Sequence, residues 1–484
     1  MTDRGGDGDG GAREASDGDE ASGSAFDDVT RRLVQRLPYG VKRLLAVPYN
    51  HVQRVRADRA FARRAREFQS LTPGADAPRH VVCVVVDALR ADVVDAETTP
   101  FLADRRVASA VTPSPWTFPA VTSLATGRYP HEHGSMRQSD DVDRGATDLV
   151  IPPTLPDHER TLPEVFAAAG YDTYGGFAFH MPFFALGGRF ATNRVYDDAP
   201  ADDVLGDFLD WFDGRRDGRT FSYVHLGDLH EPVDPPAPYW DRYDVDDSIE
   251  GIRRWRFREE AHPGHEGERY RDHRRRLYRA AATHVDDRLA VLRERLPDDV
   301  ALLVTGDHGE ALWEQTSLDR RTFHDSRPAY GIDHGGTPFE AIARVPLAME
   351  GVDVRSGGGT PSLVDVAPTL LDALGQMEAL ATTGCSLSRG VPGDRVPLVE
   401  AARYGHEKKA AYRDGWKLVV SRGDDAAVGF DLPDDPGTTA READLPADVE
   451  AALYDALPPW PDGSDPERRV SGMAQQRLED LGYV

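Results

Sequence analysis

Three short apolar runs, each followed closely by charged or polar groups, constrain the fold of this chain more than any other feature. Most of their residues are β-branched or bulky, which is typical of strands buried on both faces of a parallel sheet. The runs are 80–86, 221–226 and 300–305, and they are followed by Asp87, by Asp228 and His230, and by Asp307 and His308. Functional groups collect at the carboxyl ends of strands in open α/β sheets, so we expect these side chains to form a site.

Helical patterns alternate with these runs. Amphipathic stretches predict helices at 161–169, 204–212 and 277–296. Alternating helices and buried strands indicate an α/β fold with a mixed, mainly parallel sheet and helices on both faces.

The pattern changes near Val396. Residues 410–420 alternate like an antiparallel hairpin with its turn at Asp414 and Gly415. Two further helices are predicted, at 447–457 and 470–481. We therefore expect four parts: a disordered acidic tail (1–25), a basic helical segment (26–75), a main catalytic domain (78–395) and a small C-terminal α+β subdomain (396–484).

Composition narrows the class of protein. The chain has 83 acidic and 57 basic residues, and its few lysines are Lys42, Lys408, Lys409 and Lys417. Such an acidic surface indicates a halophilic, archaeal-like protein kept soluble in high salt, and it argues against nucleic acid as a partner. The two cysteines, Cys83 and Cys385, provide no disulfide framework and no thiolate metal site. Without a membrane-spanning segment or signal peptide, we expect a cytoplasmic protein.

Residues 27–68 form a basic amphipathic segment in this acidic chain. Two interpretations remain open: peripheral contact with an anionic membrane, or helices packed against the acidic body. Pro38 and Pro48 are expected to break the segment into pieces.

The stretch 116–128 reads as a turn that ends in a helix. Thr117 stands where an N-cap belongs, Pro119 fits the first turn, and Gly127 is placed to end the helix. Beside unpaired helix N–H groups, the Thr117 hydroxyl faces a favourable place for a phosphoryl or sulfuryl group. An ordinary capping threonine is the alternative.

Two carboxylates, an imidazole and a hydroxyl follow these strands and this turn. They belong to Asp87, Thr117, Asp307 and His308, which predict a site for one divalent cation, Mn²⁺, Mg²⁺, Ca²⁺ or Zn²⁺. A cation bound to the threonine oxygen would lower its pKa and make it a nucleophile.

On these residues the chain resembles the sulfatase family of the alkaline phosphatase superfamily. The matching segments are VVVDALRAD (84–92), TFPAVTSLATGRYPHEHG (117–134), TLPEVFAAAGYDT (161–173), DLHEP (228–232), VTGDHGE (304–310) and ARVPL (343–347). The resemblance implies the fold, the metal site and an anionic ester substrate, phosphate or sulfate.

The departures from the family bear on the chemistry. Thr117 takes the position of the formylglycine precursor and cannot be oxidised to that aldehyde, and Ala88 replaces the second aspartate of the usual pair. With His308, the set is more similar to members with threonine nucleophiles. We therefore expect hydrolysis or transfer of a phosphoester or phosphodiester. The alternatives are a sulfatase that acts without formylglycine and a non-catalytic binding protein.

The resemblance also implies helper residues. His230 and His334 match positions that contact the substrate anion or protonate the leaving oxygen, and Arg128 is a weaker catalytic candidate, as are His180 and His324. A second metal remains a less favoured alternative, with ligands from His225, Asp228, His230 and His334.

Overall fold

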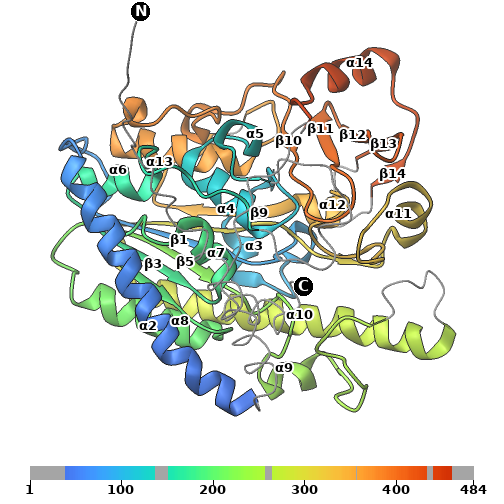
Figure 1. Cartoon of the computed structure of the whole chain (residues 1–484), viewed down its shortest axis with the longest axis horizontal. Helices are drawn as coiled ribbons and strands as arrows, with labels where there is room; N and C mark the ends of the chain where they lie inside the picture. Colours follow the sequence, from blue (N-terminus) through green and yellow to red (C-terminus); the bar gives the residue numbers. More distant parts are fainter. Residues whose placement is uncertain (1–38, 137–150, 257–263, 356, 433–439, 461–484) are drawn as a thin grey trace, which may run out of the picture.

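A seven-stranded sheet lies at the centre of the molecule, with its strands in the order β2-β9-β6-β1-β5-β3-β4 (Figure 1). The strands are β1 (His80–Val86), β2 (Arg106–Val111), β3 (Asp172–Phe177), β4 (Thr192–Val195), β5 (Thr220–Leu226), β6 (Val300–Gly306) and β9 (Arg344–Glu350). β9 runs antiparallel to both neighbours, and the other pairs are parallel, so the expected mixed, mainly parallel sheet is confirmed.

The computed structural model describes residues 39–136, 151–256, 264–355, 357–432 and 440–460. The expected acidic tail (1–25), Pro38 and the predicted helix at 470–481 lie outside the described residues.

The three apolar runs form the middle of the sheet, and every residue of β1, β5 and β6 is buried. Burying a valine or leucine side chain contributes roughly 1.5–3 kcal/mol, and a shifted register would expose these side chains. Val86 at the end of β1 lies opposite Leu226 of β5 and Gly306 of β6. Asp87 and Asp307, the next residues along β1 and β6, therefore leave the same edge of the sheet side by side.

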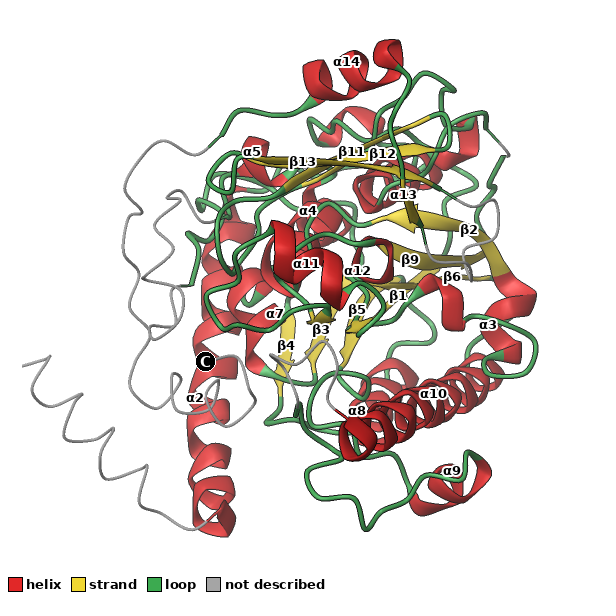
Figure 2. Cartoon of the chain, turned by 90° about the vertical axis from the view of Figure 1, so that its right-hand side faces the viewer, coloured by secondary structure: helices red, strands yellow, loops and turns green. Residues whose placement is uncertain are grey.

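Helices cover both faces of the sheet. Figure 2 shows α8 (Ala201–Asp213) and α10 (Gly264–Arg295) beneath the sheet and α4 (Thr117–Thr126) and α13 (Val366–Leu374) above it. Other helices are α3 (Pro100–Arg105), α5 (Pro130–His133), α6 (Leu162–Ala168), α7 (His180–Leu186), α9 (Ala237–Arg242), α11 (Thr316–Thr322) and α12 (Glu340–Ala343). Within the described ranges, no helix combines the length and apolar character that crossing a membrane requires.

The basic segment forms one helix, α2 (Tyr39–Arg64), which runs through Pro48. The expected break at Pro48 is therefore wrong. Contacts with the body hold the helix: Nη2 of Arg54 donates to the Val195 carbonyl at 2.8 Å, and Ala57 is buried. Of the two interpretations of this segment, packing against the body is the one that the described part shows.

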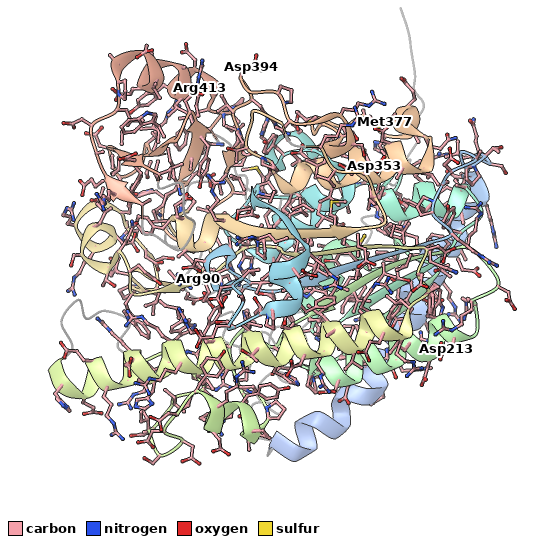
Figure 3. All side chains as sticks on the ribbon, turned by 180° about the vertical axis from the view of Figure 1, so that it is seen from behind. Arg90, Asp213, Asp353, Met377, Asp394 and Arg413 are labelled. Carbon is pink, nitrogen blue, oxygen red and sulfur yellow. The ribbon has the colours of Figure 1, made fainter. Side chains whose placement is uncertain are left out.

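A second sheet forms the C-terminal subdomain, with five antiparallel strands in the order β10-β11-β12-β13-β14. They are β10 (Leu398–Val399), β11 (Lys409–Arg413), β12 (Trp416–Ser421), β13 (Ala426–Asp431) and β14 (Arg441–Glu442), and α14 (Ala447–Ala456) packs on them. The predicted hairpin turn is confirmed, because Asp414 and Gly415 have φ angles of 51° and 79°. Seen from behind, Arg413 marks this hairpin, far from Asp213 at the end of α8 (Figure 3).

Candidate active site

Five side chains meet where β1, β5 and β6 end, and we call them the strand-end cluster. They are Asp87, Thr117, His225, Asp307 and His308, and all are fully buried. Nε2 of His225 lies 3.4 Å from Oδ2 of Asp307 and 3.8 Å from Oδ2 of Asp87. Nε2 of His308 lies 3.6 Å from Oδ1 of Asp87 and 3.6 Å from Oδ2 of Asp307. The structure thus brings together the four residues expected to hold a metal and adds His225 to them.

Thr117 faces this cluster from the first turn of α4. Its hydroxyl donates to Oδ2 of Asp87 at 3.1 Å, and its oxygen lies 3.2 Å from Nε2 of His308. The expectation that Thr117 caps the helix is wrong, because Trp116 holds the N-cap position and Thr117 is the first helical residue. A buried carboxylate accepts a stronger hydrogen bond than a neutral group, which keeps the hydroxyl turned toward Asp87. The helix ends at Gly127, as the sequence predicts.

The imidazole of His308 presents an unprotonated nitrogen to the cluster. Its Nδ1 lies 2.9 Å from the Gly309 carbonyl, which can only accept, so the ring hydrogen belongs on Nδ1 and Nε2 keeps its lone pair. Burial lowers the pKa of His308, which keeps the ring neutral. Nε2 then points its lone pair at Thr117 and the two carboxylates.

The two carboxylates of the cluster need a counter-charge. Burial and the nearby Asp307 raise the pKa of Asp87 well above its usual range. Burial acts on Asp307 in the same direction, but hydrogen bonds from the His225 ring and from the backbone N–H of His308 outweigh it and hold the pKa of Asp307 below its usual range. Among the described residues, Oδ1 of Asp87 finds no hydrogen-bond partner. Buried carboxylate oxygens in this state, beside a neutral imidazole lone pair, fit a divalent cation.

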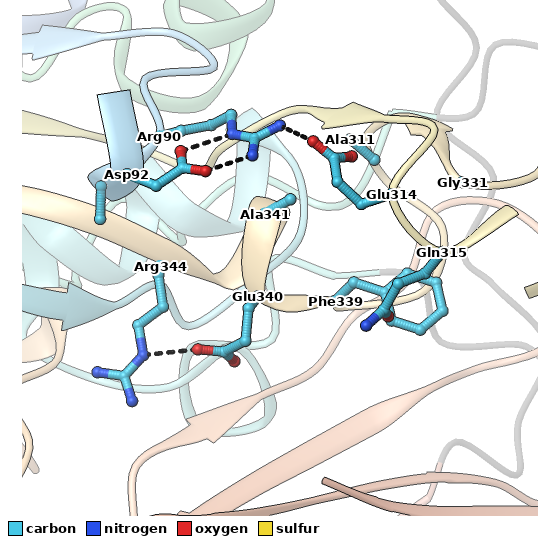
Figure 4. A pocket seen from close by; sticks show the side chains of 11 residues that line it. Arg90, Asp92, Ala311, Glu314, Gln315, Gly331, Phe339, Glu340, Ala341 and Arg344 are labelled. Atoms are coloured by element: carbon cyan, nitrogen blue, oxygen red, sulfur yellow. Dashed lines mark hydrogen bonds and ion pairs between the residues drawn. The ribbon is translucent and has the colours of Figure 1, made fainter. Parts of the chain in front are cut away.

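Arg90 ties the loop after β1 to the loop after β6 (Figure 4). Its guanidinium pairs with Asp92 and with Glu314, each at 2.5 Å, and Nη1 donates to the Glu310 carbonyl at 3.0 Å. Arg90, Asp92 and Glu314 also line a small cavity of about 30 Å³. These contacts of Arg90 hold the loop that carries Asp87 and the loop that carries Asp307 at a fixed distance from each other.

Two small residues shape these loops. Ala88, which replaces the second aspartate of the family pair, has φ 61°, and its carbonyl accepts from the Tyr278 hydroxyl at 2.6 Å. Gly309 passes so close to the backbone that an added Cβ would lie 2.0 Å from the Ala341 oxygen. Only glycine fits beside His308 without moving the loop.

A second group of buried side chains adjoins the strand-end cluster, and we call Glu310, Asp333 and His334 the Glu310 cluster. Nδ1 of His334 lies 3.2 Å from Oε1 of Glu310 and 3.1 Å from Oδ1 of Asp333. The centroid of the His334 ring lies 4.3 Å from that of His308 and 5.2 Å from that of His230. Burial lowers the pKa of His230 to about 3. Both helper histidines expected from the sequence are therefore at the site.

The weaker candidates lie outside the site. Arg128 pairs with Glu159 just beyond the C-terminal end of α4, roughly 15 Å along the helix from Thr117 at about 1.5 Å per residue. His180 bonds to a side chain of α2, and His324 lies beside the C-terminal subdomain. Arg128 is therefore removed from the candidate catalytic residues.

The four residues considered for a second metal do not meet at one point. They are His225, Asp228, His230 and His334. Asp228 accepts a hydrogen bond from the N–H of Ala201 at 3.1 Å, at the start of α8, and His225 belongs to the strand-end cluster. Sequence reasoning missed Glu310 and Asp333, which join His334 instead. Asp333 directly precedes His334, and Glu310 lies two residues after His308, so their closeness in the sequence to predicted site residues was the available sign.

Comparison with known proteins finds one family. A family model described as Sulfatase matches residues 79–376, which include every residue of both clusters. No curated protein matches the sequence.

Several solved structures share the fold. One is a protein in complex with its substrate D-glucosamine-2-N,6-O-disulfate (TM-score 0.52, 14% identity, covering 75% of this chain and 92% of that chain). Another is a 2-O GAG sulfatase (TM-score 0.53, 14% identity, covering 75% of this chain and 86% of that chain). A third is the phosphonate monoester hydrolase of Agrobacterium radiobacter (TM-score 0.53, 16% identity, covering 75% of this chain and 91% of that chain).

Proposed function

Because the chain belongs to the sulfatase family, we propose that it is a metal-dependent ester hydrolase or transferase whose nucleophile is the hydroxyl of Thr117. The observation that carries the proposal is the position of this hydroxyl, 3.1 Å from Oδ2 of Asp87 and 3.2 Å from Nε2 of His308. At the first turn of α4, it also lies where helix N–H groups favour a bound anion.

In the first step, a phosphoryl group moves from the ester to threonine. Asp87 accepts the hydroxyl proton while the Thr117 oxygen bonds to phosphorus, and the bond from phosphorus to the leaving oxygen breaks. The leaving oxygen takes a proton from a buried histidine that becomes protonated once the anionic ester lies beside it, and His230 and His334 are placed for this role. Water or an acceptor alcohol then attacks the threonine ester, gives its proton to that histidine, and restores the Thr117 oxygen, which recovers its proton from Asp87.

The residues that would hold the cation are Asp87, Asp307, the Thr117 oxygen and Nε2 of His308, with His225 beside them. When bound, a divalent cation there lowers the pKa of the hydroxyl and offsets negative charge on the ester. The mixture of oxygen and imidazole donors suits Mn²⁺ or Zn²⁺ better than Mg²⁺ or Ca²⁺, which prefer oxygen ligands.

Phosphate esters are the favoured substrates, and sulfate esters are the second candidate. The fold does not decide between them, because a sulfatase and a phosphonate monoester hydrolase both share it. Thr117 favours phosphate, since threonine cannot become the aldehyde whose hydrate attacks sulfate esters in the family it resembles. A plain hydroxyl is sufficient for phosphoryl transfer.

The outer side of α2 supports a second proposal, contact with an anionic membrane. Arg56, Arg59, Arg63 and Arg66 are exposed and spaced three or four residues apart, so they form one stripe along α2 and the turn that follows it. In a chain of formal net charge -26, this stripe concentrates positive charge on one surface.

Replacement of Thr117 tests the nucleophile. Thr117→Val should lower turnover by on the order of 10⁴-fold or more, because the attacking oxygen is gone. Thr117→Ser should keep part of the activity, because its oxygen stays beside Asp87. The valine variant loses the hydrogen bond to Asp87, worth roughly 1.5–3 kcal/mol of stability, but it should stay folded, because Trp116 and not Thr117 holds the N-cap position.

The measurement uses phosphomonoester, phosphodiester and sulfate-ester substrates in parallel, which also decides the substrate class. Mass spectrometry of protein quenched during turnover should find a phosphoryl adduct on the peptide that contains Thr117. Near-wild-type turnover by Thr117→Val would assign the attack to a water molecule instead.

A further inference from the structure

We propose that the Glu310 cluster holds a second divalent cation, beside the one that the strand-end cluster would bind. One ligand atom from each of Glu310, Asp333 and His334 lies within 4.8 Å of the other two. The His334 nitrogen Nδ1 is 3.2 Å from the Glu310 oxygen and 3.1 Å from the Asp333 oxygen. Ligand atoms bound at about 2.0–2.2 Å to one ion lie roughly 3 Å or slightly more from each other, so this spacing suits a shared ion.

Glu310 supplies an independent reason for a ligand at this place. The residue is 1% exposed, and among the described residues its oxygen Oε2 has no hydrogen-bond partner. A buried carboxylate oxygen without a protein donor costs free energy. A cation in contact with the carboxylate would remove that cost.

Two guanidinium groups lie near the cluster, and neither forms an ion pair with Glu310. Arg327 lies 2.7 Å from an oxygen of Asp333 and 2.9 Å from one of Asp325, so its single charge is already shared between two carboxylates. Nη1 of Arg274 donates to a backbone carbonyl at 3.1 Å instead of pairing with Glu310. Within the described ranges, Glu310 therefore pairs with no arginine or lysine.

The position of this cluster suggests what a second ion would do. The rings of His334 and His308 lie 4.3 Å apart between centroids, so the two clusters adjoin one another. An ion there would offset charge on the leaving oxygen. This role depends on the function proposed above, and it leaves His230 as the proton donor, because Nδ1 of His334 would be bound. The binding of the ion does not depend on that function.

Metal stoichiometry of the full-length protein tests the proposal. Protein stripped with a chelator is titrated with Mn²⁺ and separately with Zn²⁺, and bound metal is measured after free ions are removed. Wild-type protein should bind two ions per chain, and two Mn²⁺ ions this close should give a spin-coupled EPR spectrum. Glu310→Gln should bind one ion and give the spectrum of isolated Mn²⁺, because the amide keeps the shape of the side chain and removes its charge.

Glu164→Gln is the matched control, because Glu164 is also 1% exposed but pairs with Arg64 and Arg189. It should still bind two ions. Wild-type protein that saturates at one ion would overturn the proposal, whether or not Glu310→Gln folds, and so would a Glu310→Gln protein that binds two.

Thr117→Val separates this proposal from the proposed function. At saturating Mn²⁺ the variant should bind two ions and turn over poorly. Normal turnover with two ions bound would refute the nucleophile and leave the second cation standing.

Discussion

Two regions of this protein bury charged side chains, and they balance those charges in opposite ways. In the C-terminal subdomain, the protein supplies its own counter-charges. Nζ of Lys409 lies 2.7 Å from Oε2 of Glu400, and Nζ of Lys417 lies 2.8 Å from Oε1 of Glu340. The ammonium of Lys408 donates to three backbone carbonyls. Each buried lysine there has a carboxylate or backbone carbonyls as partners.

At the carboxyl edge of the central sheet, the buried carboxylates have no basic side chain as a partner among the described residues. Asp87, Asp307 and Glu310 face histidines, and within the described part of the chain none of them pairs with lysine or arginine. Burial lowers the pKa of His308 and of His334, so these histidines are neutral partners. A buried charge that has an oppositely charged partner within the protein contributes to the folded structure. Buried carboxylates that have only neutral imidazoles beside them indicate instead a site for a bound cation.

Lysine usage follows the same division. Of the four lysines in the chain, Lys408, Lys409 and Lys417 are buried in the C-terminal region, and the side chain of Lys42 is outside the described residues. The described surface therefore carries its positive charge on arginine and histidine.

The largest expected effect comes from replacing one of the buried carboxylates at the carboxyl edge of the central sheet. Asp307→Asn should remove metal binding to the strand-end cluster and lower turnover by about 10³-fold or more, because the cation loses a charged ligand. The fold should remain, since the change also relieves repulsion between Asp307 and Asp87. Metal analysis, steady-state kinetics and thermal unfolding measure the three outcomes. A variant with full metal content and a normal rate would show that the cation is held elsewhere.

Removing a buried charge in the C-terminal subdomain should instead lower the stability of the protein and leave its metal content unchanged. Lys409→Met leaves Glu400 buried with only His131 as a partner, and breaking such a pair costs about 3–5 kcal/mol of unfolding free energy. Metal content should not change. The double variant Lys409→Met with Glu400→Leu should recover most of the stability, as measured by denaturant unfolding. Equal stability of the single variant and the wild type would contradict a structural role for the pair.

The contribution of the Lys409–Glu400 pair to stability should depend on pH. Burial alone would raise the pKa of Glu400, but His131 and Lys409 outweigh it and hold this pKa below its usual value. The pKa of Glu400 is thus lower in the folded protein than in the unfolded chain, where it is about 4.3. The stabilisation is present above the unfolded pKa and is lost as the pH falls below it. In Lys409→Met this loss as the pH falls below about 4.3 should be smaller than in the wild type.

Local patterns were sufficient for the central strands and for Asp87, Asp307 and His308. Each apolar run predicts a strand by itself, and the residue after it is known from the sequence. The orientation of Thr117 was not predictable in this way, because its partners Asp87 and His308 are 30 and 191 residues away. His225 joins the cluster through the register of β5 against β1, which the sequence does not reveal.

The misplacement of Arg128 has a different cause. The helix from Thr117 to Thr126 separates Arg128 from the hydroxyl of Thr117 by about 1.5 Å per residue, a distance that the predicted helix already implied. The sequence motif shared with the family made Arg128 a candidate catalytic residue, and the length of the helix shows that it lies outside the site.

The smallest expected effect extends the comparison to positive charge. On α2, Arg64 points inward and pairs with Glu164 at 2.8 Å, whereas Arg56 and Arg59 are exposed and form no ion pair with other described residues. By the reasoning applied to the carboxylates, arginines without internal partners are available to an external anion. Vesicles that contain anionic phospholipid should therefore bind the protein, and a flotation assay measures the bound fraction.

Removing two of these charges should weaken vesicle binding without touching the site. Arg56→Gln with Arg59→Gln should lose roughly 1 kcal/mol of binding free energy per arginine at low salt. At about 1 M salt the Debye length falls to roughly 3 Å, so the difference from wild type should nearly vanish. Arg321→Gln with Arg441→Gln removes the same charge from exposed positions far from α2 (Figure 1) and should bind as the wild type does. If both double variants lose binding equally, net charge and not the α2 stripe governs the contact, and the parallel between the two kinds of unbalanced charge fails.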